Sequence, residues 1–163
     1  MKKIFLTLAV LLALAGCVKE YEKHHITLND PKGIDTIFFP SDQRLKIGDK
    51  PYLLFFFGTD CGVCKTQIPD LNELRKVYGD RVEFIGVLGP SKGFDVDMAL
   101  LKEHSIEFKT TSDKISVDYF SKAVGGVMGV PVTYVFDKNG KIAGKFIGLT
   151  PRGVLEGAIK SVL

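Results

Sequence analysis

The sequence predicts an α/β domain in which helices cover both faces of a mixed central sheet. Short apolar runs bounded by turn residues alternate with amphipathic segments from Ile34 onward. A strong hairpin turn, Asp137 to Gly140, separates two such runs near the C-terminus. An amphipathic segment then closes the chain. Strand–helix units followed by an antiparallel hairpin and a helix produce this kind of layered fold.

Buried strands are expected where apolar runs are bounded by Pro, Asp and Gly. These runs cover residues 34–39, 52–57, 82–88 and 132–136, and the hairpin partner covers 141–147. A shorter extended piece is expected at 106–110.

Four helices are predicted from apolar spacing and capping residues. The first follows the 52–57 strand and ends at Gly79, where glycine favours termination. Asp95 is expected to cap the second, which runs to about Ser105. Ser112 or Asp113 would cap the third, and Thr150–Pro151 would open the fourth. Their expected inward-facing positions are Ile68, Leu71, Leu74, Val77 and Tyr78, then Met98 and Leu101, then Ile115, Tyr119 and Val124, and finally Val154, Leu155, Ala158, Ile159 and Val162.

The first 33 residues are predicted to lie outside the domain, which would span 34–163. Residues 1–16 have a positive start and an apolar run of 12 residues, Ile4–Ala15, which is too short for the ~20 that span a bilayer. Leu14–Cys17 resembles a bacterial lipoprotein box, which implies cleavage before Cys17 and a lipid on its thiol. An ordinary signal peptide with a chance cysteine is the alternative. Residues 17–33 would form a polar tether with a solvated His24–His25 pair.

Charge and composition argue against nucleic acid as a partner. The chain has 22 basic and 19 acidic side chains, and removal of Lys2 and Lys3 leaves 20 against 19. Most aromatic residues are phenylalanines within apolar runs, which indicates a core and not a base-stacking surface.

The cysteines indicate redox chemistry. If Cys17 carries lipid, only Cys61 and Cys64 among the three cysteines keep a free sulfur. One pair closing a very small loop is no disulfide scaffold and stabilises a fold little. A zinc half-site is the competing interpretation, but it would need two more ligands from His24, His25 and His104. We therefore expect neither metal nor cofactor.

The position of the pair between a strand and a helix suggests how it works. Cys61 would begin the helix, where free backbone N–H groups and the positive helix end favour a thiolate and lower its pKa. Cys61 would attack a substrate disulfide, and Cys64, one turn further on, would resolve the mixed disulfide.

Two motifs carry a family resemblance. The segment Phe57–Lys65 resembles the active-site segment of thioredoxin-like proteins, and Pro69 lies where that family kinks its first long helix. Gly129–Thr133 resembles the family loop that bears a cis-proline. The extra helix before the 132–136 strand is similar to the TlpA/ResA-like branch, whose members are anchored outside the cytoplasm. The resemblance implies a thioredoxin-like fold with an N-terminal strand extension and an extra middle helix, and a substrate-binding role for Val130 and Pro131 beside Cys61.

Two residues depart from the family pattern and are candidates for redox tuning. Asp60 occupies the position before the first cysteine, where Trp is usual, and Gln67 replaces an acidic residue of the ResA-like branch. A carboxylate beside Cys61 would raise the pKa of that thiol and make the protein a stronger reductant. Gln67 cannot exchange protons.

The expected function is reduction of extracytoplasmic protein disulfides, including the haem-binding cysteines of apocytochrome c, with electrons from a membrane reductase. An oxidase or isomerase of the same fold is one alternative. A Cu(I) carrier using Cys61, Cys64 and Met128 is another, although Met128 is expected to pack near the Val-Pro loop. A peroxidase is the third, and the paired cysteines and Asp60 argue against it.

Overall fold

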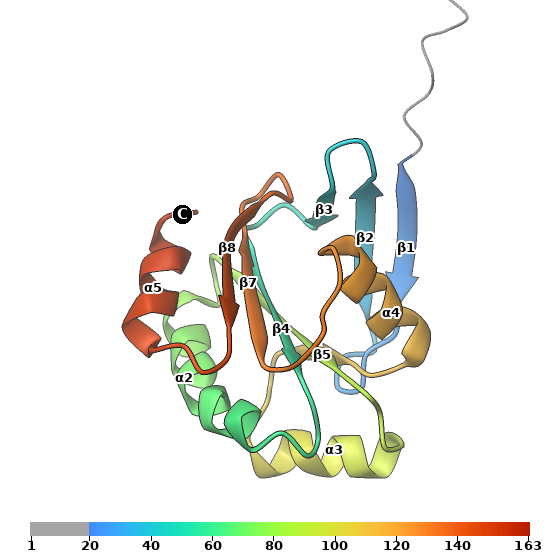
Figure 1. Cartoon of the computed structure of the whole chain (residues 1–163), viewed down its shortest axis with the longest axis vertical. Coiled ribbons are helices and arrows are strands. Elements are labelled where there is room, and N and C mark those ends of the chain that lie inside the picture. The colour runs from blue at the N-terminus through green and yellow to red at the C-terminus, as the bar shows by residue number, and fades with distance from the viewer. Residues whose placement is uncertain (1–19) are drawn as a thin grey trace, which may run out of the picture.

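The computed structural model describes residues 20–163 and contains the predicted mixed sheet (Figure 1). The expected signal peptide and Cys17 lie outside these residues. Five strands follow the order β6-β5-β4-β7-β8, with β4, β5 and β6 parallel and β7 and β8 antiparallel to their neighbours. Their bounds are Tyr52–Phe57 for β4, Glu83–Leu88 for β5, Lys109–Thr111 for β6, Val132–Phe136 for β7 and Ile142–Ile147 for β8.

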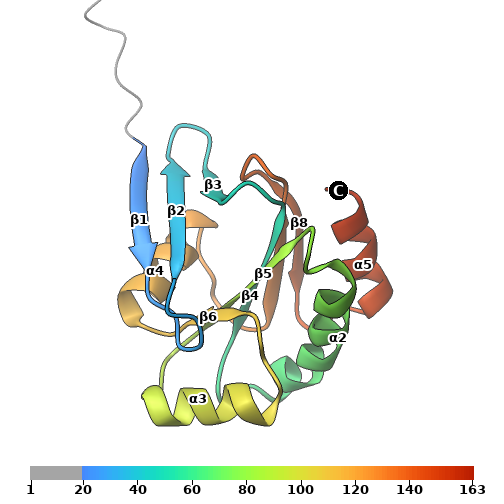
Figure 2. The ribbon, with the colours of Figure 1, turned by 180° about the vertical axis from the view of Figure 1, so that it is seen from behind.

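Helices cover both faces of this sheet, as predicted. Figure 1 and the reverse view in Figure 2 place α2 (Gly62–Tyr78) and α5 (Arg152–Lys160) on one face and α4 (Lys114–Ala123) on the other. The remaining helix, α3 (Phe94–Glu103), packs through Leu100 and Leu101 against the apolar cluster that also contains residues of α2 and α5. No helix within residues 20–163 is both long and apolar enough to cross a membrane.

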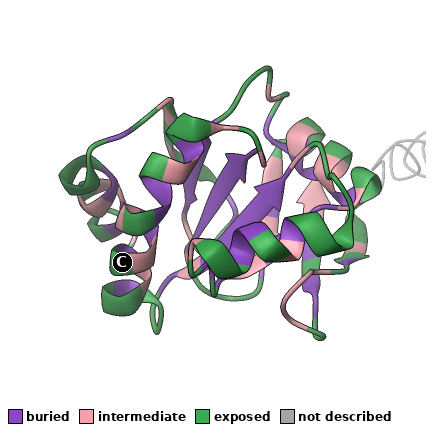
Figure 3. Ribbon diagram, turned by 90° about the horizontal axis from the view of Figure 1, so that it is seen from below, coloured by how far each residue is buried: buried purple, intermediate pink, exposed green. Residues whose placement is uncertain are grey.

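Figure 3 shows buried strands in the middle of the domain, and every residue of the central strand β4 is buried. Its alternate side chains enter two separate clusters: Leu53, Phe55 and Phe57 pack toward α2, whereas Tyr52, Leu54 and Phe56 pack toward α4. All six are at most 3% exposed. This continuous apolar run therefore fixes the strand that leads directly into Cys61.

The N-terminal part of the domain differs from the prediction. Strands β1 (Tyr21–His25), β2 (Ile34–Phe39) and β3 (Arg44–Ile47) form a separate antiparallel sheet. The predicted polar tether is therefore wrong from Tyr21 onward, and the extension contains three strands. The error has a physical cause, because β1 is short and polar and depends on pairing with β2 more than on its own apolar surface.

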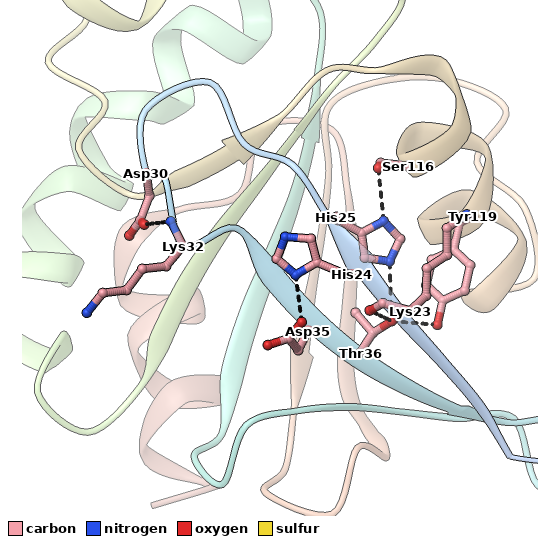
Figure 4. A network of polar contacts seen from close by, with 9 residues as sticks. All are labelled: Lys23, His24, His25, Asp30, Lys32, Asp35, Thr36, Ser116 and Tyr119. Atoms are coloured by element: carbon pink, nitrogen blue, oxygen red, sulfur yellow. Dashed lines mark hydrogen bonds and ion pairs between the residues drawn. The ribbon is translucent and has the colours of Figure 1, made fainter.

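The prediction of a solvated His24–His25 pair is wrong for His25, which is 1% exposed. Its Nδ1 lies 2.9 Å from the hydroxyl of Ser116 on α4, and its Nε2 lies 3.2 Å from that of Thr36 on β2 (Figure 4). The rings of Tyr119 and Phe120 lie 4.6 Å from the imidazole, centroid to centroid. Burial, with a smaller contribution from Lys23, lowers the pKa of His25 to about 4. His25 thus joins β1 to α4 as a neutral residue.

Helix starts agree only partly with the predicted caps. Asp113 caps α4, because its carboxylate accepts the Ser116 N–H at 2.9 Å. Asp95 does not cap α3, which begins after Gly93, and α5 begins one residue later than expected, after Pro151. Three predicted inward positions are exposed instead: Val77, Ile115 and Val154.

Candidate active site

Cys61 and Cys64 lie where β4 passes into α2 and form a disulfide. Cys61 is the N-cap of α2, and its Sγ accepts the backbone N–H of Cys64 at 3.1 Å. Cys61 is partly exposed, whereas Cys64 is fully buried. The two sulfurs therefore differ in access: a partner molecule can reach only Cys61 directly.

The helix start provides the electrostatic environment that the sequence predicted for Cys61. The first turn of α2 contains no acidic residue, so its backbone N–H groups face the sulfur without a competing carboxylate from the helix. Such an environment favours a thiolate once the disulfide is reduced. Pro69 lies inside α2, at the position where the resemblance places a proline.

Three chain segments meet beside the cysteines. The Val130–Pro131 bond is cis, as predicted, and the Val130 carbonyl oxygen lies 3.8 Å from Cys61 Sγ. A Cβ on Gly58 would lie 3.3 Å from the Gly89 carbonyl oxygen and 3.6 Å from a methyl of Val130. Gly58 therefore permits the close approach of the β4–α2 turn, the β5–α3 loop and the Val130–Pro131 loop.

These segments line an open cavity of about 250 Å³ next to Cys61. Two charged residues, Asp60 and Lys92, also line it and form an ion pair. Sequence reasoning missed Lys92, which comes from the distant β5–α3 loop. The Lys92 ammonium therefore partly offsets the negative charge that Asp60 places next to Cys61 in the sequence.

Gln67 lies one turn after Cys64 and is fully buried. Its Oε1 accepts the backbone N–H of Thr150 at 2.7 Å, which ties α2 to the turn before α5. Its Nε2 has no hydrogen-bond partner among residues 20–163. The amide therefore has a clear structural contact where the resemblance expects an acidic group.

Two candidate metal ligands, Met128 and His25, lie in surroundings that differ from those expected from the sequence. Met128 is 105% exposed, so the expectation that it packs near the Val-Pro loop is wrong. His25 is already held by two hydroxyl groups in the β1–α4 contact. Within the described part of the chain, no group of three or more His, Cys, Asp or Glu side chains is arranged to hold a metal ion.

Solved structures of thioredoxin-family proteins share this fold. A thiol:disulfide interchange protein of the thioredoxin family from Chlorobium tepidum TLS superposes with a TM-score of 0.67 at 18% identity, covering 88% of this chain and 92% of its own. StoA from Bacillus subtilis superposes with a TM-score of 0.64 at 17% identity, over 86% and 98% of the two chains.

Sequence comparison then gives the family: residues 18–163 match the Redoxin model, and the chain belongs to the Redoxin family. The thiol-disulfide oxidoreductase YkuV of Bacillus subtilis strain 168 is 32% identical over 123 residues, covering 72% of this chain and 80% of the relative. The thiol-disulfide oxidoreductase ResA of Bacillus anthracis is 27% identical over 176 residues, covering 98% and 96%. With its Cys61–Cys64 pair, the chain is a thiol–disulfide oxidoreductase.

Proposed function

We propose that this oxidoreductase reduces protein disulfides outside the cytoplasm, with Cys61 as nucleophile and Cys64 as resolving thiol. The observation that carries the proposal is the asymmetry of the pair. Cys61 is accessible and accepts a helix N-terminal N–H, whereas Cys64 is buried behind it. This arrangement favours attack by Cys61 on an external disulfide and an internal second step.

The reaction proceeds in two exchanges. The Cys61 thiolate attacks one sulfur of the substrate disulfide, forming a mixed disulfide and releasing the other sulfur as a thiolate, which takes up a proton. Cys64 then loses its proton and attacks the Cys61 sulfur, which forms the Cys61–Cys64 disulfide and releases the second substrate thiol. Two electrons pass from the protein to the substrate. An external donor must reduce Cys61–Cys64 before the next cycle.

The Val130–Pro131 loop is the proposed substrate-binding element. Val130 is 39% exposed and its carbonyl oxygen faces Cys61 at 3.8 Å, whereas Pro131 is buried and fixes the loop on β7. An extended substrate segment that pairs with this backbone would bring its cysteine next to Cys61.

Asp60 and Gln67 are the proposed redox-tuning residues. Asp60 places a carboxylate beside Cys61, and Lys92 limits its effect by pairing with it. Gln67 places a neutral amide where an acid would exchange protons with Cys64, so water or another group must carry that proton. The resemblance to the ResA-like branch supports the reducing direction.

The proposed location rests on the N-terminal sequence. A positive start, a short apolar run and the lipoprotein-like box support export and lipid attachment at Cys17. Such an anchor would hold the domain near a membrane reductase that supplies electrons. Disulfides of extracytoplasmic proteins, apocytochrome c among them, are the proposed substrates.

Two parallel assays separate a reductant from an oxidant of the same fold. The reduced protein is mixed with a disulfide-containing protein, and the oxidised protein is mixed with a reduced, unfolded one. A reductant reacts rapidly in the first assay and slowly in the second. The reverse ranking would support the oxidase alternative, and tight Cu(I) binding with no exchange in either assay would support a copper carrier.

A further inference from the structure

A second cavity, of about 290 Å³, lies beside the Val130–Pro131 loop. Val130 lines both this cavity and the cavity next to Cys61, so the two are adjacent. A substrate segment that follows this loop can place its cysteine in one cavity and a nearby side chain in the other. Successive side chains of an extended segment alternate and advance about 3.3 Å per residue, so the second side chain belongs to a residue close to the cysteine.

Strand β8 contributes residues to the lining of this cavity and lies at the edge of the sheet, where no further strand of the sheet within residues 20–163 covers it. Tyr134 pairs with Lys145 and Val132 pairs with Ile147, so the β8 side chains point toward the same face as their β7 partners. β8 is the last strand of the sheet, and Ile147 is 75% exposed. Met128, which also lines the cavity, is fully exposed. The two side chains offer apolar surface to a ligand.

Among residues 20–163, the side chains that line the cavity include one cation and no carboxylate. Lys145 is the one charged lining residue in the described part of the chain, and its ammonium lies 5.4 Å from the centroid of the Tyr134 ring. The Tyr134 hydroxyl is buried and has no hydrogen-bond partner within residues 20–163. Because this oxygen is buried, a ligand in the cavity does not reach it, and the exposed Lys145 ammonium is the side-chain donor that a ligand can contact.

We propose that this cavity selects substrates that carry a glutamate near the reactive cysteine. The two methylenes of the glutamate would pack against Met128 and Ile147, and its carboxylate would bind the Lys145 ammonium. This inference rests on the proposed reductase function and adds a determinant of its substrate preference. It assigns Lys145 to substrate recognition, remote from the exchanging sulfurs.

The test uses peptides with one cysteine held as a mixed disulfide with 2-mercaptoethanol, which is neutral. The peptides differ at one position, two residues before or two residues after the cysteine, which holds Glu, Gln or Lys. The second-order rate constant for reduction by the reduced protein is measured at low and high salt. We expect reduction of the Glu peptide about three- to fivefold faster than that of the Gln peptide at low salt, and a smaller difference at high salt.

Charge reversal gives the sharper test. Lys145→Glu should invert the order, so that the Lys peptide reacts faster than the Glu peptide. Lys141→Glu is the matched control, because it makes the same charge change at the start of the hairpin and Lys141 does not line the cavity. Equal rates for the Glu and Gln peptides with the unmodified protein, or an equal effect of both charge reversals, would overturn the proposal.

If no peptide is reduced by any form of the protein, the proposed reductase function itself fails, and that result differs from uniform reduction of all peptides.

Discussion

The domain contains two pairs of chemically versatile residues, His24–His25 at one edge and Cys61–Cys64 at the start of α2, and it uses them in opposite ways. His25 is buried, and both ring nitrogens lie within hydrogen-bond distance of hydroxyl groups (Figure 4). Cys61 is partly exposed beside an open cavity, and its sulfur accepts one backbone N–H. The difference shows that access and unused bonding capacity, more than residue type, separate a structural group from a reactive one.

The largest effect should come from removal of the cysteines. Cys61→Ser should abolish disulfide reduction, lowering the rate by at least about a thousandfold, because an alcohol is a very weak nucleophile at neutral pH. Cys64→Ser should keep the first attack and accumulate the mixed disulfide, since the buried resolving thiol is missing. Mass spectrometry of the protein after mixing with a peptide disulfide detects the adduct. An adduct on Cys64 in the Cys61→Ser protein would show that access does not determine the order of attack.

His25 should make the stability of the fold depend on pH. Its pKa is about 4 in the folded protein and about 6.5 in an unfolded chain, so the unfolded state binds the proton first as pH falls. The stability contribution is complete above about pH 6.5 and is lost between there and pH 4, by up to roughly 3 kcal/mol. Urea unfolding at pH 7.5 and pH 4.5 measures the loss.

The matched variants for this prediction are His25→Gln and His24→Gln. His25→Gln should remove most of the acid-dependent loss, even if it lowers stability at neutral pH. His24→Gln should retain it, because His24 is exposed and its Nδ1 lies within hydrogen-bond distance of the exposed Asp35 carboxylate. The same loss on acidification in all three proteins would mean that another group is responsible.

Gln67 lies near the cysteines but, like His25, it is buried and makes a structural contact. In a Gln67→Glu protein, burial should raise the pKa of the new carboxyl above the value of about 4.3 expected in an unfolded chain. Stability should therefore match the parent protein near pH 4 and be lost as pH rises through the folded pKa, by roughly 1–3 kcal/mol at pH 7.

Gln67→Met provides the control for that prediction. It should weaken the fold equally at both pH values, because the Thr150 N–H loses its acceptor and no charge is introduced. Urea unfolding of the oxidised proteins at pH 4 and pH 7 measures both effects. A Gln67→Glu protein with no added pH dependence would indicate that the site is more open to water than the structure shows.

The smallest effect should come from the exposed pair Asp60–Lys92. Lys92→Gln leaves the carboxylate unpaired, so the pKa of Cys61 should rise, whereas Asp60→Asn leaves the ammonium alone and should lower it. The change in thiolate fraction below the pKa should be about two- to fivefold because both side chains are exposed to solvent. Thiolate absorbance at 240 nm during pH titration of the reduced proteins follows the change. The double variant should return close to the parent, and identical titrations for all four proteins would remove this pair from redox tuning.

Sequence patterns predicted the central sheet well because its apolar runs are continuous and its hairpin turn has strong local signals. Asp137–Gly140 forms the expected turn, and Gly140 adopts the positive φ of 82° that such turns favour in glycine. Cys61 and the Val130–Pro131 loop also carried local signals and lie together as expected.

The predictions failed where a residue depends on partners that are distant in the sequence. His25 looks like a solvated residue until β2 and α4 cover it, and Lys92 reaches Asp60 from another loop. The sequence predicted that Met128 packs near the Val-Pro loop, yet its side chain is fully exposed to solvent. None of these contacts leaves a periodic or local pattern, so one sequence does not reveal them.

The reduction potential of the Cys61–Cys64 pair tests the proposed function most directly. The protein is equilibrated in glutathione or dithiothreitol buffers, and the fraction of disulfide is measured after acid quenching and thiol alkylation. We predict a potential near or below about −270 mV, the range of a reducing thioredoxin. A potential close to about −120 mV would instead mark an oxidant and contradict the proposal that this protein delivers electrons to substrate disulfides.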